Sequence, residues 1–95
     1  MTLPLKRQEV ANYSVQFRSS AEKELARLPL ALKQRIANSI EQLTSQPRSA
    51  SVRKLEGFDN LYRLRVGDYR VVFELIDKSH SIIINKIRHR REAYD

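Results

Sequence analysis

The chain has 95 residues, no cysteine, and 18 lysines and arginines against 11 acidic residues, giving a formal net charge of +7. This length fits one small domain, and the lack of cysteine excludes disulfides and thiolate metal ligands. Uninterrupted apolar runs such as 82–84 are far shorter than the roughly 20 residues that span a membrane. The charge favours a polyanionic partner, nucleic acid or an acidic protein, although a merely soluble basic surface carries a similar charge.

The N-terminal residues 1–11 show no clear period, and we expect them to form a mobile or loosely docked arm ahead of a single domain over 12–95. No apolar segment follows the basic pair at 6–7, so a secretory signal is not expected. A cysteine-free chain is compatible with a reducing compartment, and we expect a cytoplasmic protein. Alternation over 12–19 then predicts a half-buried strand.

Two helices are predicted next. The segment 19–29 reads as a short helix, with Ser19 and Glu22 at capping-box spacing and a proline closing it. The segment 30–47 reads as a longer helix that ends at Pro47. Its apolar stripe consists of Leu32, Ile36, Ile40 and Leu43. We expect Arg35 on this helix to be a solvated surface charge.

The second half of the chain reads as strands. Residues 48–60 have no clear period and are expected to be a connector. Segments 61–66 and 69–76 form a hairpin through a Gly-Asp turn, and 81–88 follows as a third strand. The order predicts an α+β domain: an N-terminal strand, a two-helix hairpin and a three-stranded antiparallel meander, with the helices packed on one sheet face. The first strand can then lie beside a later one.

Three arginines converge in this hairpin. Pairing across the turn puts Arg65 opposite Arg70, and Arg63 projects from the same face. Like charges facing each other across two strands destabilise the pair. A single arginine on an exposed sheet face needs no explanation, since its stem simply lies along the surface. Three together suggest a bound anion that relieves the repulsion, and arginine suits bidentate phosphate contacts.

The C-terminal segment extends the basic pattern. Basic residues surround a histidine, with a tyrosine near the end: Lys86, Arg88, His89, Arg90, Arg91 and Tyr94. Arginine plus an aromatic ring is typical of single-stranded RNA recognition, whereas charge runs are also common as solvated tails. If Ile76 pairs with Ser81, Arg88 points away from the face of Arg63, and a one-residue bulge reverses this. The sequence leaves both arrangements open.

Common enzyme sites are mostly excluded by the residue types. The two histidines lack zinc-ligand spacing, and the two glycines sit in separate turns rather than in a phosphate-binding loop. No serine lies in a nucleophile-elbow motif, and the basic region holds too few acidic residues for a two-metal nuclease. We therefore expect no metal and no cofactor, so that any RNA cleavage would be metal-independent.

Three motifs in order carry a resemblance to a known family: KLEG at 54–57, YRLRVGDYRVVFEL at 62–75 and IRHRREAY at 87–94. With these separations the chain resembles the RelE/ParE toxin superfamily from about residue 13 to 94, and specifically its RelE branch. The resemblance implies the toxin of a type II toxin-antitoxin system that cuts mRNA codons in the ribosomal decoding site. The 2′-hydroxyl attacks the adjacent phosphate without metal.

The resemblance also implies partners: a RelB-like acidic antitoxin, the ribosome and mRNA, and operator DNA only through the antitoxin, with no membrane. By position, Arg70 would hold the scissile phosphate, and Arg88 would stabilise charge and protonate the leaving oxygen. Tyr94 would stack on the nucleotide. Further RNA or ribosome contacts would come from Lys54, Lys86, Arg90 and Arg91.

One departure from the family concerns the general base. Arg63 and Arg65 stand where the best-studied member has lysines, and an arginine effectively cannot lose its proton. His89 is the replacement we expect, although a surface histidine in a basic tail fits its position equally well. Charge stabilisation by the arginines could instead carry most of the rate. Two other functions remain open: a ParE-like inhibitor of DNA gyrase, and an inactive co-repressor that binds the antitoxin.

Overall fold

The structure, a computed structural model, describes residues 12–92, so the predicted arm at 1–11 and Tyr94 lie outside the described residues. The elements in chain order are β1 (Ser14–Phe17), α2 (Ser19–Ala26), α3 (Leu30–Leu43), β2 (Val52–Lys54), β3 (Leu61–Val66), β4 (Tyr69–Ile76), the 3-10 turn η1 (Asp77–Ser79), β5 (Ser81–His89) and the 3-10 turn η2 (Arg90–Glu92). Within this range no helix is long and apolar enough to cross a membrane. The predicted α+β order is confirmed.

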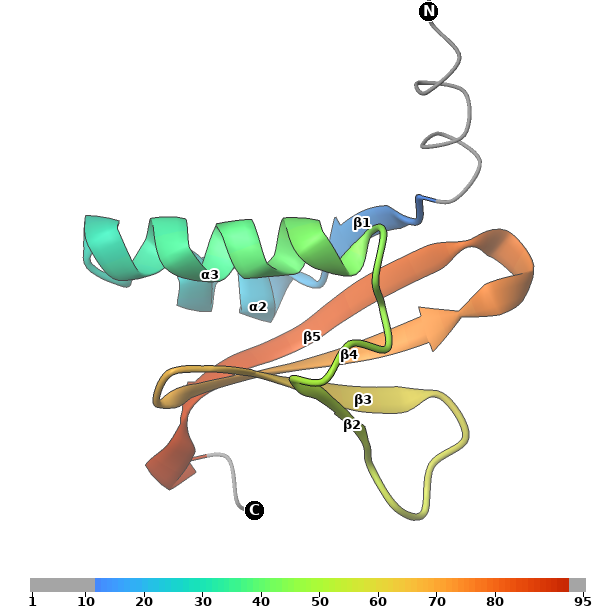
Figure 1. The fold of residues 1–95 in the computed structure, drawn as a ribbon. Coiled ribbons are helices and arrows are strands. Elements are labelled where there is room, and N and C mark those ends of the chain that lie inside the picture. Colours follow the sequence, from blue (N-terminus) through green and yellow to red (C-terminus); the bar gives the residue numbers. More distant parts are fainter. Residues whose placement is uncertain (1–11, 93–95) are drawn as a thin grey trace, which may run out of the picture.

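The strands form one five-stranded sheet in the order β1-β5-β4-β3-β2. All neighbouring pairs are antiparallel except β1 and β5, which run parallel. Figure 1 shows α2 and α3 on the same face of this sheet. The two helices follow β1 directly, and β1 lies beside the later strand β5, an arrangement that the sequence order allowed. The opposite face carries no helix in the described part of the chain, and we call it the open face.

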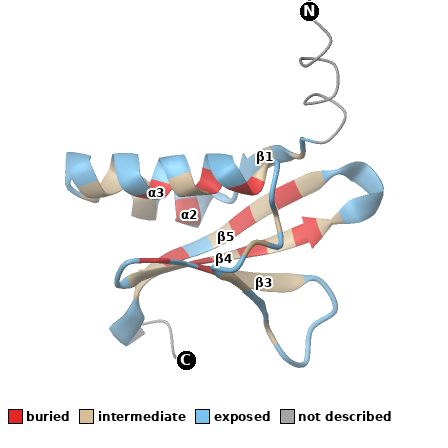
Figure 2. Ribbon diagram, viewed as in Figure 1, coloured by how far each residue is buried: buried red, intermediate tan, exposed pale blue. Residues whose placement is uncertain are grey.

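The core lies between the helices and the sheet. Figure 2 shows buried positions along α3 and along the central strands β4 and β5. Three members of the predicted α3 stripe, Ile36, Ile40 and Leu43, are at most 3% exposed. They face alternate residues of the sheet: Leu64, Val66, Val71, Phe73, Leu75, Ile82, Ile84 and Ile87. The alternating apolar residues of the strands and the apolar stripe of α3, which recurs about every four residues, therefore pack together in one hydrophobic layer.

Three local predictions are wrong. The expected connector contains β2, because three residues are too few to show an alternating pattern. The N-cap of α2 is Arg18 rather than Ser19. The backbone N–H of Arg18 still donates to Ile84 O of the sheet at 2.9 Å, and the Arg18 side chain makes no capping hydrogen bond. Helix α3 stops before Thr44, whose hydroxyl donates to Glu41 O at 2.7 Å, rather than continuing to Pro47.

The β3–β4 turn depends on a glycine. Gly67 has φ +59°, and Asp68 does not take a left-handed conformation, which is the type II′ arrangement for a two-residue hairpin. A Cβ at Gly67 would lie 3.1 Å from Nη1 of Arg35 on α3. The turn thus needs glycine for its backbone, whereas the guanidinium end of the exposed Arg35 can shift by a few tenths of an ångström.

Replacing Gly67 tests this requirement. Gly67→Ala should lower the free energy of unfolding by about 1–2 kcal/mol, because alanine is strained in the left-handed region. Gly67→Asn is the control, since asparagine tolerates this region better while adding a side chain at the same contact. Urea unfolding measures both. Equal losses for the two variants would show that crowding at Arg35, rather than φ, limits the position.

Candidate functional site: a row of arginines on the open sheet face

Arginines from three adjacent strands stand side by side on the open face. Arg65 of β3 pairs with Arg70 of β4, as predicted, and Arg70 pairs with Arg88 of β5. Paired residues of antiparallel strands project to the same side of the sheet, with Cβ atoms about 4.5–5.5 Å apart. These three residues are called the arginine row below. Its members are exposed or half-buried, so the row can be reached from solvent.

A one-residue irregularity in β5 brings Arg88 into the row. Ile76 pairs with Ser81, and this register continues to Phe73 and Ile84, but Val72 then pairs with Lys86. Asn85 is the extra residue, and the alternation resets beyond it. The bulge that the sequence left open is therefore present. Without it, Arg88 would point toward the helices and Ile87, which is 3% exposed, would leave the core.

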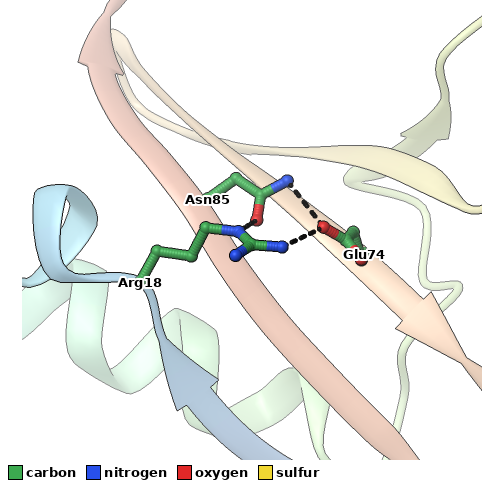
Figure 3. Close-up of polar contacts among 3 residues, drawn as sticks. All are labelled: Arg18, Glu74 and Asn85. Carbon is green, nitrogen blue, oxygen red and sulfur yellow. Dashed lines mark hydrogen bonds and ion pairs between the residues drawn. The ribbon is translucent and has the colours of Figure 1, made fainter.

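Three side chains hold this bulge, as Figure 3 shows. Arg18, which follows β1, donates from Nε to Oδ1 of Asn85 at 2.8 Å and from Nη2 to Oε2 of Glu74 at 2.9 Å. Asn85 Nδ2 also donates to Oε2 of Glu74 at 3.2 Å. The three strands β1, β5 and β4 are thus linked at the extra residue. The Arg18 guanidinium lowers the pKa of Glu74, and Asn85 adds to this, while burial opposes it.

A second group of basic residues lies next to the row. Arg53 of β2 pairs with Arg63 of β3, Arg63 pairs with Val72, and Val72 pairs with Lys86. Arg63 is half-buried and its Nε is shielded from solvent. A pocket lined by Arg53, Arg63 and Arg65 with Ala50, Ser51 and Gly67 opens beside them. Sequence reasoning missed Arg53, although extending the 61–66 pairing into residues 52–54 would have found it.

Other predicted site residues lie elsewhere. Lys54 pairs with Tyr62, which places it on the side of Leu64 rather than of Arg63. His89 pairs with Tyr69 on the helix-covered side, where the two rings meet edge to face at 5.3 Å. Nδ1 of His89 accepts the Arg91 N–H at 3.2 Å, so in its neutral form the ring carries its proton on Nε2. The structure does not bring His89 to the arginine row.

The segment after β5 stays close to the β3–β4 turn. Arg90 N–H donates to Asp68 O at 2.7 Å, which fixes the start of η2 beside the hairpin that carries Arg65 and Arg70. Arg90 and Arg91 are exposed in this turn. Arg35 of α3, expected to be an ordinary solvated charge, lies over Gly67 of the same hairpin. Positive charge from four elements therefore gathers around one end of the sheet.

The opposite end of the sheet is closed by structural contacts. Asp77 accepts the Tyr13 hydroxyl at 2.7 Å and Nη2 of Arg48 at 2.8 Å, while the Tyr13 ring stacks on His80 at 4.6 Å. The Arg48 bond, with the Tyr13 bond second, lowers the pKa of Asp77. The Arg48 guanidinium also lies 5.6 Å from the centre of the Tyr62 ring. These contacts connect the residue before β1 to the loops that follow α3 and β4. The basic end of the sheet is therefore the candidate nucleic-acid interface.

The pKa of Glu74 generates a pH prediction. Because the folded-state pKa lies below the ordinary 4.5, the carboxylate contributes stability above that pH, and the contribution is lost as the pH falls through the folded value. Between neutral pH and about pH 3, Glu74→Gln should therefore lose less stability than the wild type. Melting temperatures across this range measure it. In an Arg18→Ala background, Glu74→Gln should change the pH dependence of stability little. A change as large as in the wild-type background would contradict the role of Arg18 in lowering the pKa of Glu74.

The like-charge pair generates a second prediction. Arg65→Gln should raise the free energy of unfolding by about 0.2–1 kcal/mol at low ionic strength, because Arg65 directly faces Arg70. The gain should disappear near 1 M salt, where the screening length is about 3 Å. Lys78→Gln, which removes the same charge from η1 at the other end, is the control. A loss of stability in Arg65→Gln would mean that other contacts of this side chain outweigh the repulsion.

Comparison with known proteins places the chain in a family. The family described as the ParE toxin of type II toxin-antitoxin system, parDE, matches residues 15–94. Toxin RelE3 of Methanocaldococcus jannaschii is 31% identical over 85 residues, which cover 85% of this chain and 94% of that protein.

Solved structures agree. An archaeal RelE-RelB complex from Pyrococcus horikoshii aligns at TM-score 0.75 with 34% identity, over 86% of this chain and 99% of that chain. The isolated Escherichia coli RelE toxin aligns at TM-score 0.74 with 20% identity, over 86% of this chain and 88% of that chain, which supports the fold alone. The chain therefore belongs to the RelE/ParE superfamily of toxins from type II toxin-antitoxin systems, as a RelE-like member.

Proposed function

We propose that this toxin is a ribosome-dependent mRNA endoribonuclease that inhibits translation by cutting codons in the decoding site. The observation that carries the proposal is the arginine row, in which Arg65, Arg70 and Arg88 face the same side from three paired strands. Like charges at directly paired positions repel one another, and a phosphodiester bound between them would offset the repulsion while accepting their hydrogen bonds. The neighbouring Arg53 and Arg63 extend the same surface along an RNA strand.

The chemistry we propose needs no metal. The 2′-oxygen of the mRNA forms a bond to the adjacent phosphorus and the bond to the 5′-oxygen breaks, leaving a 2′,3′-cyclic phosphate and a 5′-hydroxyl. Negative charge grows on the phosphoryl oxygens and on the leaving oxygen as this happens. Arg70 and Arg65 stabilise the former, and Arg88 stabilises the latter until the leaving oxygen takes a proton from solvent. Donors fixed in advance where charge develops are the largest single contribution in many enzymes.

A strong general base is not part of this proposal. Arginine does not deprotonate at physiological pH, and His89 lies on the helix-covered side of the sheet with its Nδ1 already accepting a backbone N–H. The proton of the attacking hydroxyl passes to solvent, and the rate comes from charge stabilisation and from the geometry imposed on the mRNA. Tyr94 is proposed to stack on a base, and the attachment of η2 at Asp68 supports it by keeping the chain beside the row.

The proposed partners are expected to contact the arginine row and further basic residues, including Lys54 on the other side of the sheet. The ribosome and its mRNA would contact the exposed basic residues Lys54, Lys86, Arg90 and Arg91. A RelB-like acidic antitoxin is supported by similar structures that are RelE-RelB complexes. It would cover the arginine row, and operator DNA would be contacted only through it. We further propose that this occurs in the cytoplasm, with 12–95 acting as a single toxin domain.

A second candidate function has its own support. The match over residues 15–94 is to a family described by its ParE toxin, which favours inhibition of DNA gyrase by binding, without nuclease chemistry. An inactive co-repressor that binds the antitoxin is a third possibility. We place cleavage first because a binder has no need to oppose Arg65 to Arg70 and Arg88 on one face.

Toxin added to a cell-free translation reaction tests the proposal. Primer extension should show breaks within codons, and Arg70→Ala or Arg88→Ala should slow their appearance by about 10²–10³-fold. Lys78→Ala, in η1 at the opposite end of the sheet, should cleave like the wild type. Intact mRNA at doses that arrest translation would reject the nuclease. Loss of supercoiling by purified gyrase in a parallel assay would then establish the second candidate.

A further inference from the structure

A carboxylate on α2 binds two successive residues of β5. Oε1 of Glu24 accepts the backbone N–H of Ile87 at 2.8 Å, and Oε2 accepts Nε of Arg88, also at 2.8 Å. The Glu24 side chain is 21% exposed and that of Arg88 is 40% exposed, so the ion pair is partly shielded from water. Glu24 is more than 60 residues away in sequence, and sequence analysis gave it no role.

The fold explains why this carboxylate is available. Strand β1 pairs with β5 only as far as Phe17 and Ile84, so the later half of β5 is an edge on that side. A free N–H at such an edge needs an acceptor when a helix covers it. Glu24 lies on the turn of α2 next to this edge. Glu24 and Arg88 line one shallow groove together with Leu28, Tyr69 and His89.

The bond to Glu24 constrains the long side chain of Arg88. Arg88 stands at the end of the arginine row, where Arg70 repels it. An arginine side chain has many rotamers, and an ion pair through Nε reduces their number. The negative charge of Glu24 on the other side offsets the repulsion, and its contact with Nε fixes the plane of the guanidinium.

We propose that Glu24 is a positioning residue for RNA cleavage, acting through Arg88. The role rests on the proposed nuclease function, and it makes Glu24 part of the machinery without contact with the RNA. Glu24 sets the position of the guanidinium before the mRNA arrives, so that stabilisation of the leaving oxygen costs no reorganisation. A purely structural alternative is that Glu24 only satisfies the free N–H of Ile87.

A glutamine separates the two roles. Glu24→Gln keeps one carbonyl oxygen for the Ile87 N–H, but the amide nitrogen facing Nε of Arg88 is itself a donor, so that bond is lost. Glu22→Gln is the matched control, since Glu22 is an exposed acidic residue on the first turn of the same helix. Thermal unfolding of both variants reports any loss of structure separately from cleavage.

The experiment measures cleavage of mRNA on programmed ribosomes by the full chain. Glu24→Gln should reduce kcat by roughly 10-fold to 100-fold, with KM close to the wild type and a melting temperature that stays above the assay temperature. Glu22→Gln should leave kcat unchanged. Combining Glu24→Gln with Arg88→Ala should cleave no more slowly than Arg88→Ala alone, because the two residues act as one unit.

Different failures have different meanings. An unchanged or increased kcat in Glu24→Gln, beside a clear loss in Arg88→Ala, would overturn the positioning role and leave the nuclease standing. A further loss in the double variant would also overturn it, since Glu24 would then act independently of Arg88. Wild-type toxin that leaves the mRNA intact on the ribosome would reject the nuclease itself, and the role of Glu24 in cleavage with it.

Discussion

The single extra residue at Asn85 determines which side chains of β5 stand on the candidate functional face. Before the bulge, even-numbered residues of β5 such as Ile82 and Ile84 pack into the core, and after it Ile87 does so. The reset keeps an apolar residue inward and turns Arg88 outward beside Arg70. A regular strand would do the reverse and bury a guanidinium against the helices, at a cost that a chain of 95 residues could not offset. The contacts of Arg18, Glu74 and Asn85 therefore stabilise the fold and build the site together.

The arginine row lowers the stability of the fold that carries it. Facing like charges reduce stability, and a small domain has little stability to spare. An isolated surface arginine would add solubility without this cost, so the arrangement makes sense where an anion arrives to relieve it. The proposed phosphate would find these charges already held together by the sheet, so its binding would not require them to be assembled first. The same reasoning explains why an acidic partner would bind this face.

The sequence predicted more of the fold than of the site. The two-residue turn at Gly67 fixes the register of its hairpin, and so the pairing of Arg65 with Arg70 followed from local rules. The bulge did not, because it depends on Arg18, which lies far away in the sequence and is brought in by the parallel pairing of β1. Arg53 was missed because β2 is too short for its pattern to be recognised. Glu24 was missed because an acidic residue on a short amphipathic helix looks like any solvated charge.

The brevity of β1 links these features. It has four residues because α2 begins at Ser19, directly after Arg18, and so it leaves the edge of β5 opposite β4 without a strand partner beyond Ile84. A longer β1 would continue the ladder past Asn85, occupy the N–H of Ile87 and exclude Glu24 from the edge. The early start of α2 instead places Glu24 against that edge, about one and two-thirds helical turns after Arg18, the residue that clamps the bulge. The bulge at Asn85, Arg88 and its carboxylate partner Glu24 thus all lie along the part of β5 that β1 does not cover. A change in where β1 ends would disturb all three at once.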